Sequence, residues 1–182
     1  MISYVLGFVF DWGYHHVLLI EKKTPAWQAG RLNGLGGKIA GTEKPPEAMR
    51  RELCEETRGA LGGEVELKPF GRLRGEDYEV WLFWGRVAGV GENRLLREHC
   101  ENSTTNSCEF ADRALPTLPS RLAGIETPEG TTLVALVSDL SHWPVLPNLR
   151  YLVPMAMNHA RGLDSARFFE IAETEVPAEV GS

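Results

Sequence analysis

Cysteine is scarce in this chain of 182 residues, and long apolar runs and an excess of basic residues are absent. The three cysteines, Cys54, Cys100 and Cys108, include no Cys-x-x-Cys pair, which argues against a disulfide framework and a structural zinc site. No segment reaches the roughly 18 consecutive apolar residues of a membrane-spanning helix. The apolar start has no basic leader and is interrupted at Asp11, so it predicts a strand rather than a signal peptide. We therefore expect a protein of the reducing cytoplasm with no membrane partner.

The charge balance limits the partners further. Lys and Arg number 19 against 25 Asp and Glu, which gives a formal net charge of −6. Because DNA and RNA are bound by neutralising their phosphates with Lys and Arg, this balance excludes general binding of a nucleic acid polymer. A small phosphorylated molecule stays open, provided that local cations or a metal ion offset the negative field.

Apolar and turn residues predict a mixture of strands and helices without a strict β-α-β rhythm, which is typical of the α+β class. Expected strands cover residues 3–10, 17–20, 64–73, 79–87, 132–137 and 167–172. Expected helices cover residues 46–58 and 151–161. Pro45 and Pro46 suit the start of the first helix, because proline lacks an N–H that would have no partner there.

One domain is expected over residues 1–175, since the apolar share of 43% is enough for one packed core. Residues 91–130 hold a polar run and several prolines with little periodicity. We interpret them as an inserted loop outside the core, with a short helix near residues 93–99. Residues 176–182 are expected to form a flexible tail.

A helix-spaced acidic cluster carries the most specific chemistry. Glu52, Glu55 and Glu56 are spaced i, i+3 and i+4, so on a helix they form one carboxylate patch. Carboxylates this close repel one another, and a hard cation such as Mg²⁺ relieves the repulsion while bridging to substrate phosphates. Taken alone, the spacing also fits a solvated helix face on which Arg51 pairs with Glu47 or Glu55.

The residues around this cluster resemble the Nudix box, which runs Gly, five residues, Glu, seven residues, then Arg-Glu-apolar-x-Glu-Glu-x-Gly-apolar. The positions in register are Gly37, Glu43, Arg51, Glu52, Leu53, Glu55 and Glu56. The chain departs from the box at Arg58, where the box has a glycine, and Gly59 follows one residue later. We therefore expect the helix to end one residue late, with Gly59 as its C-terminal cap.

The resemblance implies the Nudix fold, an α/β/α sandwich with a mixed β-sheet, and a hydrolase that cuts the diphosphate of a nucleotide. It implies that Mg²⁺, with Mn²⁺ as the alternative ion, is held by four residues: Gly37, Glu52, Glu55 and Glu56. Arg51 would orient the carboxylates, Lys38 would lie beside the metal site, and Glu43 would stabilise the turn into the helix. The implied reaction is attack on phosphorus by a metal-polarised water.

Further likeness points to the oxidised-purine nucleoside triphosphate diphosphatases, the MutT-like subgroup. Residues 22–38 resemble the mouth of their site, which implies substrate contacts for Lys23 and Lys38. Asn33 would hydrogen-bond the base, because an amide offers both a donor and an acceptor. Trp27 would lie against the base, since an aromatic face stacks on any base. Asn33 is also typical of a turn, and Trp27 also suits a core or lid position.

Two later segments extend this likeness. Glu76 matches an extra acidic residue that binds metal or acts as a base, although a Gly-Glu-Asp turn is commonly just solvated. Asn148 lies in the loop before the last helix, where the subgroup often offers two aspartates to the purine edge. Here Asn148 and Leu149 replace them, which makes a preference for an oxidised base an open question. Asn148 also suits a helix cap.

The sequence therefore predicts a nucleotide diphosphatase that acts on a small nucleotide, as a monomer or a homodimer. The expected reaction converts a purine nucleoside triphosphate, oxidised or not, to the monophosphate and pyrophosphate. The alternative substrates are ADP-ribose, a dinucleoside polyphosphate or another nucleoside diphosphate derivative. A Nudix-fold sensor that binds nucleotides without turnover is the alternative from another class; such proteins usually lose box glutamates, which this chain keeps.

Overall fold

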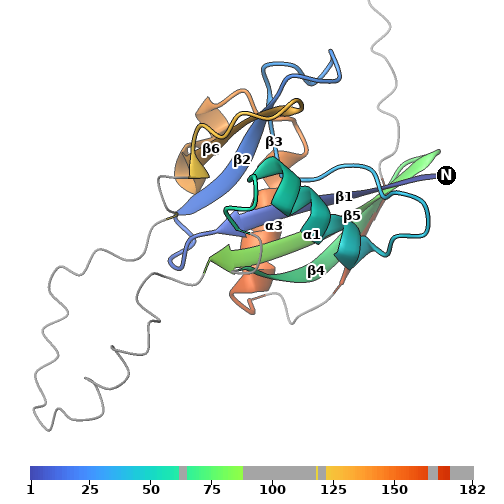
Figure 1. The fold of residues 1–182 in the computed structure, drawn as a ribbon. Coiled ribbons are helices and arrows are strands. Elements are labelled where there is room, and N and C mark those ends of the chain that lie inside the picture. The colour runs from blue at the N-terminus through green and yellow to red at the C-terminus, as the bar shows by residue number, and fades with distance from the viewer. Residues whose placement is uncertain (62–64, 88–117, 119–121, 164–167, 173–182) are drawn as a thin grey trace, which may run out of the picture.

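The computed structural model describes residues 1–61, 65–87, 118, 122–163 and 168–172. Within these ranges seven strands form one sheet, in the order β3-β2-β1-β5-β4-β7, with β6 also paired to β2 (Figure 1). The strands are β1 (Ile2–Phe10), β2 (His16–Lys22), β3 (Leu32–Asn33), β4 (Val65–Arg74), β5 (Tyr78–Val87), β6 (Gly130–Leu136) and β7 (Phe169–Ala172). The helices are α1 (Pro45–Glu56), the 3₁₀ helix η2 (Val137–His142) and α3 (Leu149–Ala160). Across the described residues, no helix is both long and apolar enough to cross a membrane.

Helices α1 and α3 cover opposite faces of the sheet (Figure 1). Successive side chains of a strand point to opposite faces, so β1 contributes to both layers of the core. Val9 packs in the cluster that contains Met49 of α1, whereas Phe8 packs in the cluster that contains Leu152 of α3. All four side chains are fully buried. The predicted α/β/α sandwich of the α+β class is therefore confirmed.

The sheet is mixed, and its pairing leaves half of one edge of β1 free for the glycine-rich segment. β1 pairs with β5 in parallel along its whole length, but it meets β2 only at its last two residues. Along the earlier half of β1, Val5 donates its N–H to Gly37 O (2.9 Å) and Gly7 donates to Leu35 O (2.7 Å). The glycine-rich segment is thereby attached to the sheet next to α1, which places it beside the glutamates.

Helix α1 ends earlier than predicted. Its last residue is Glu56, and Thr57 follows as the C-cap, where its Oγ1 donates a hydrogen bond to Leu53 O (2.6 Å). The chain then takes positive φ at both Arg58 (47°) and Gly59 (78°). The expectation of a helix that closes one residue late is wrong, because Arg58 itself adopts the left-handed conformation that the box normally gives to glycine.

The prediction that residues 91–130 lie outside the core is wrong for the end of that segment. Leu118 and Leu122 are buried, with 4% and 0% of their surface exposed, in the core layer on the α1 side. Leu122 O also accepts a hydrogen bond from Thr132 Oγ1 (2.6 Å), which ties this end to β6. Apolar residues near its C-terminal end thus join the fold despite the polar run before them. Residues 88–117 and 119–121, with the expected short helix, and the tail from residue 173 lie outside the described residues.

Candidate active site

Helix α1 presents its three glutamates unequally. Glu52 and Glu56 lie four residues apart on the face that turns toward the sheet, and they are only 4% and 2% exposed. Glu55 points outward, with 58% of its side chain exposed. Gly37 lies against Glu52 so closely that a Cβ at position 37 would come 2.5 Å from its Oε1. Any side chain at position 37 would therefore displace the carboxylate of Glu52.

The carboxylate of Glu56 has a defined partner on each oxygen. Its Oε2 accepts the N–H of Gly36 (2.8 Å), and its Oε1 accepts a hydrogen bond from Lys22 Nζ (3.1 Å). Lys22 also donates to Glu129 Oε2 (3.0 Å). Glu129 precedes β6 and was not among the predicted site residues. The register of β2 with β6, which pairs Lys22 with Gly130, brings it there.

Arg51 donates hydrogen bonds to the other two glutamates. Its Nη1 donates to Glu52 Oε1 (2.7 Å) and to Glu55 Oε2 (3.1 Å). Its Nε donates to Glu43 Oε1 (3.1 Å), and its Nη2 donates to Lys38 O (3.1 Å). One guanidinium therefore joins the turn before α1, the glycine-rich segment and the helix. Glu43 also accepts the N–H of a residue in that turn, in keeping with its expected role.

Burial changes the acidity of the inward-facing glutamates. Desolvation raises the pKa of Glu56 to about 7, although the charge of Lys22 and the hydrogen bonds from Lys22 and Gly36 act in the opposite direction. Burial likewise raises the pKa of Glu52 despite its hydrogen bond with Arg51. Buried carboxylates of this kind gain from an additional positive charge nearby.

The donor set suits a hard cation, because it offers carboxylate oxygens and backbone carbonyls. The backbone N–H of Gly36 contacts Glu56, and a Cβ at Gly37 would meet the carboxylate of Glu52. Among the described residues, however, no three Asp, Glu, His or Cys side chains gather closely enough to hold a metal ion together. The glutamates are instead held individually by Lys22 and Arg51.

A cavity of about 660 Å³ opens beside this cluster. The predicted residues that line it are Trp27, Asn33, Gly37, Lys38 and Asn148. At two positions the lining residue is a neighbour of the predicted one, since Lys22 lines the cavity rather than Lys23, and Asp77 lines it rather than Glu76. Lys23 forms a surface ion pair with Glu126. Lys22 and Asp77 were therefore missed by one position each.

The apolar wall of the cavity comes mainly from β1, β4 and β5. The apolar and aromatic residues there are Ile2, Tyr4, Val5, Leu6, Leu73, Tyr78 and Val80. Asn148, before α3, completes the lining, and its Oδ1 is buried without a hydrogen-bond partner within the part of the chain that the structure describes. Asn33 Oδ1 accepts the N–H of Gly34 (2.9 Å), so that amide is partly used in its own turn. The two asparagines therefore differ, since the Asn33 amide oxygen has a hydrogen-bond partner and the Asn148 amide oxygen has none among the described residues.

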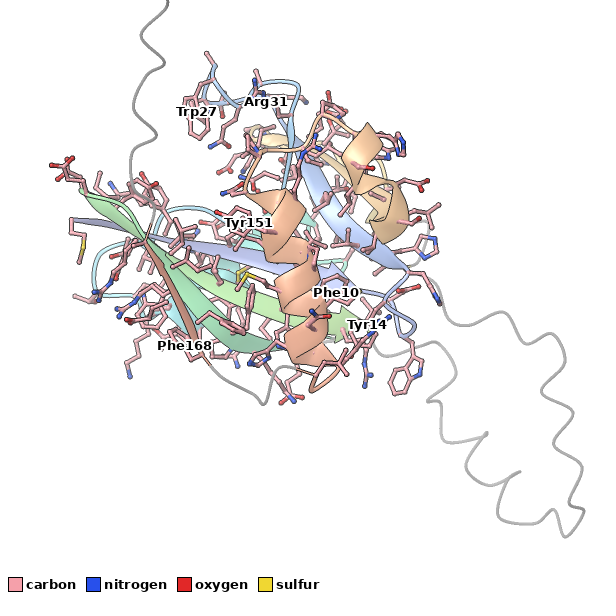
Figure 2. The ribbon with its side chains drawn as sticks, turned by 180° about the vertical axis from the view of Figure 1, so that it is seen from behind. Phe10, Tyr14, Trp27, Arg31, Tyr151 and Phe168 are labelled. Atoms are coloured by element: carbon pink, nitrogen blue, oxygen red, sulfur yellow. The ribbon has the colours of Figure 1, made fainter. Side chains whose placement is uncertain are left out.

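Trp27 lies on the loop between β2 and β3. Figure 2 shows it on that loop together with Arg31, while Tyr151 lies on α3 below. The ring of Trp27 lines the cavity, yet 67% of its surface is exposed. An exposed indole at the rim of a cavity is positioned to cover a ligand rather than to support the core. Trp27 is therefore not the core residue that the sequence also allowed.

Comparison with known proteins identifies the fold. No protein-family model and no curated protein sequence matches the chain. Solved structures do match: a MutT structure from work on Aliivibrio salmonicida and Vibrio cholerae is 17% identical, with a TM-score of 0.51 over 86% of this chain and 98% of that chain. MutT from Bacillus halodurans is 18% identical, with a TM-score of 0.53 over 96% and 92%.

A third structure differs in its ligand. It is the NUDIX domain of Shewanella oneidensis NrtR, complexed with ADP ribose, which is 12% identical with a TM-score of 0.58 over 88% of each chain. At identities this low, the structural matches establish the architecture and leave the substrate open. The matches extend over most of this chain and of each neighbour, and the chain has the Nudix fold.

Proposed function

We propose that this chain is a Mg²⁺-dependent Nudix hydrolase that converts purine nucleoside triphosphates, oxidised bases included, to the monophosphate and pyrophosphate. The observation that carries the proposal is the position of the cavity, which reaches both the carboxylate cluster and a free amide. Lys22 and Gly36, which contact Glu56, line it, and so does Asn148. A nucleotide in this cavity has its phosphates and its base within reach of the two kinds of group that recognise them.

Each residue of the carboxylate cluster has a task in this reaction. Glu52, Glu55 and Glu56 would hold the cation. When bound, Mg²⁺ would activate water and neutralise charge on the diphosphate. Arg51 fixes the orientation of Glu52 and Glu55 through its hydrogen bonds to both. Gly37 lets the backbone approach the phosphates, because no side chain covers it.

The base side of the cavity supports a purine. Its wall of aliphatic and aromatic side chains suits a flat ring, and Trp27 at the rim adds an aromatic face. Asn148 and Asn33 supply amides that read a base edge without a change of charge. Because the subgroup often carries aspartates before the last helix, discrimination between normal and oxidised guanine should be weaker in this chain.

A substrate panel with Mg²⁺ tests the proposal. It should include adenosine and guanosine triphosphates with and without an 8-oxo group, pyrimidine triphosphates, ADP-ribose and a dinucleoside polyphosphate, with products separated by ion-exchange chromatography. We expect the highest kcat/KM for a purine triphosphate, with release of pyrophosphate rather than phosphate. A higher kcat/KM for ADP-ribose or the dinucleoside polyphosphate than for every triphosphate would contradict the substrate assignment and leave the carboxylate site in place.

ADP-ribose hydrolysis is the second candidate, because a structural neighbour with the same fold is complexed with ADP ribose. Binding of nucleotides without turnover is the third, and the retained glutamates of α1 argue against it. The same panel separates the three, since a sensor would show saturable binding of a nucleotide in calorimetry but no Mg²⁺-dependent product.

A further inference from the structure

Lys22 is a buried lysine whose charged group contacts three oxygen atoms of the described residues. It is 7% exposed, and its Nζ lies 3.1 Å from Glu56 Oε1, 3.0 Å from Glu129 Oε2 and 3.5 Å from Gly36 O. An ammonium has three N–H donors, and here each has an acceptor. Three oxygens from three distant parts of the chain therefore surround one positive charge.

These three oxygens are of the kind that a hard divalent cation binds. Glu56 Oε2 accepts the N–H of Gly36 (2.8 Å), whereas Glu56 Oε1 shares the Lys22 ammonium with Glu129 Oε2. A cation that approaches Glu56 through Oε1 therefore meets the ammonium of Lys22 in its way. Two positive charges at this separation repel strongly in a buried site, so the ion and the ammonium cannot both stay.

We propose that Lys22 is the resident counter-cation of the carboxylate cluster, and that a divalent cation binds Glu56 and Glu129 by displacing the Lys22 ammonium into the adjoining cavity. This inference rests on the proposed function, since Glu56 belongs to the cation site proposed there, and it adds Glu129 to that site. Lys22 is a positioning residue in it: without the metal ion, its ammonium holds Glu129 and Glu56 together. The cavity that Lys22 lines provides the space for the displaced group.

The metal ion displaces Lys22 rather than Arg51 because the two basic side chains differ in how many partners they have outside the carboxylate cluster. Arg51 also binds Glu43 and Lys38 O, which lie outside the carboxylates of α1, so it keeps partners when a cation takes Glu52. The side-chain acceptors of Lys22 in the described part of the chain are Glu56, Glu129 and Gly36 O, which all lie in the site. Its backbone is fixed in β2 by the N–H bond to Arg31 O (3.0 Å), which leaves the flexible side chain to move.

Amine labelling of the wild-type protein tests displacement directly. The protein is treated briefly with an amine-acylating reagent, with and without saturating Mg²⁺ and no nucleotide, and each lysine is quantified by mass spectrometry. Lys23 serves as the internal reference, since it is half exposed and pairs with Glu126 outside the cavity. We expect Mg²⁺ to raise labelling of Lys22 several-fold and to leave Lys23 unchanged. Unchanged or reduced labelling of Lys22 when Mg²⁺ is bound overturns the inference.

Metal affinity gives an independent measurement. Lys22→Met keeps a long unbranched side chain but removes the competing charge, so the Kd for Mg²⁺ in isothermal titration calorimetry should tighten by about tenfold or more. The rise in melting temperature with Mg²⁺ should also be larger than in the wild type. Lys23→Met is the matched control, with an unchanged Kd expected. An unchanged or weaker Kd in Lys22→Met contradicts the inference.

The two measurements separate this inference from the proposed function. If neither the wild type nor Lys22→Met binds Mg²⁺, the cation site itself fails, and this inference fails with it. If the wild type binds Mg²⁺ but Lys22 labelling does not change, displacement alone fails. If only Lys22→Met binds Mg²⁺, competition by Lys22 is supported even though the wild-type site is weak.

Discussion

The two sides of the cavity differ in how many of their polar groups already have partners. On the carboxylate side, Glu52 and Glu56 are buried and held by Arg51 and Lys22. On the base side, the buried Oδ1 of Asn148 has no partner in the described part of the chain. A buried polar atom without a hydrogen bond costs about 1–3 kcal/mol, so such a group is retained at the expense of stability. The carboxylate side is organised by ion pairs within the protein, whereas the proposed base side contains a buried amide oxygen that has no partner among the described residues.

Glu56→Gln should have the largest effect, because it acts on the organised side. We expect kcat to fall by about 100-fold or more, since a carboxylate that holds the cation is lost. The protein should stay folded, because Gln can still accept the N–H of Gly36 and Lys22 keeps Glu129. Steady-state kinetics and circular dichroism measure the two effects. Glu66→Gln, at an exposed glutamate of β4, is the control, and near-normal Mg²⁺-dependent turnover in Glu56→Gln would refute the site.

Arg51→Met should mainly lower the stability of the protein, because Arg51 holds the carboxylate side together. It removes hydrogen bonds to Glu43, to Glu52 and to a backbone carbonyl, and it leaves Glu52 buried without its cation. We expect the free energy of unfolding to fall by about 1–3 kcal/mol, measured by urea denaturation. Arg50→Met, at the exposed neighbour on the same helix, should change it by less than about 0.5 kcal/mol. Equal losses in both variants would count against this role for Arg51.

Asn148→Ala, on the base side, should lower activity and leave stability nearly unchanged, whereas Arg51→Met lowers stability. We expect kcat/KM for purine triphosphates to fall by about tenfold, the value of one lost hydrogen bond. The free energy of unfolding should not fall by more than about 0.5 kcal/mol, because Oδ1 has no partner within the described residues to lose. Asn33→Ala is the comparison: it should change the ranking among bases and also cost stability, since Asn33 Oδ1 accepts the N–H of Gly34. A large loss of stability in Asn148→Ala would remove the contrast between the two asparagines.

Trp27→Ala should have the smallest effect. The ring is mostly exposed, so the stability of the protein should not change, and KM should rise a few-fold across purine substrates. Trp143→Ala, at another exposed tryptophan, is the control and should leave KM as it is. If KM is equally unaffected in Trp27→Ala, the indole does not contact the base.

The sequence predicted the carboxylate side better than the base side for a physical reason. Glu52, Glu55 and Glu56 are close in sequence, so helical geometry alone places them near one another. Glu129 lies more than 70 residues after Glu56, and only the register of β6 with β2 brings it to Lys22. No spacing rule in one sequence reveals that register.

The smaller errors of the sequence analysis also arise from features that only the folded structure determines. Lys22 and Lys23 are adjacent and chemically identical, and the alternation of β2 decides that Lys22 lies inside and Lys23 outside. The burial of Leu118 and Leu122 was likewise missed, because apolar residues beside a polar run carry no periodic signal of their own. The two-residue strand β3 is too short to show any alternation.

The two rims of the cavity differ in how firmly their backbones are attached to the sheet. Gly37 and Ile39 are bound to the backbone of β1 at 2.9 Å, so withdrawing this rim would break hydrogen bonds of the sheet itself. The opposite rim is the loop that carries Trp27, whose backbone bonds are local, such as Gln28 N–H to Pro25 O (2.8 Å). We therefore expect a ligand to enter and leave beneath Trp27, and the rate of product release to depend on the motion of residues 24–29 rather than on that of residues 35–39.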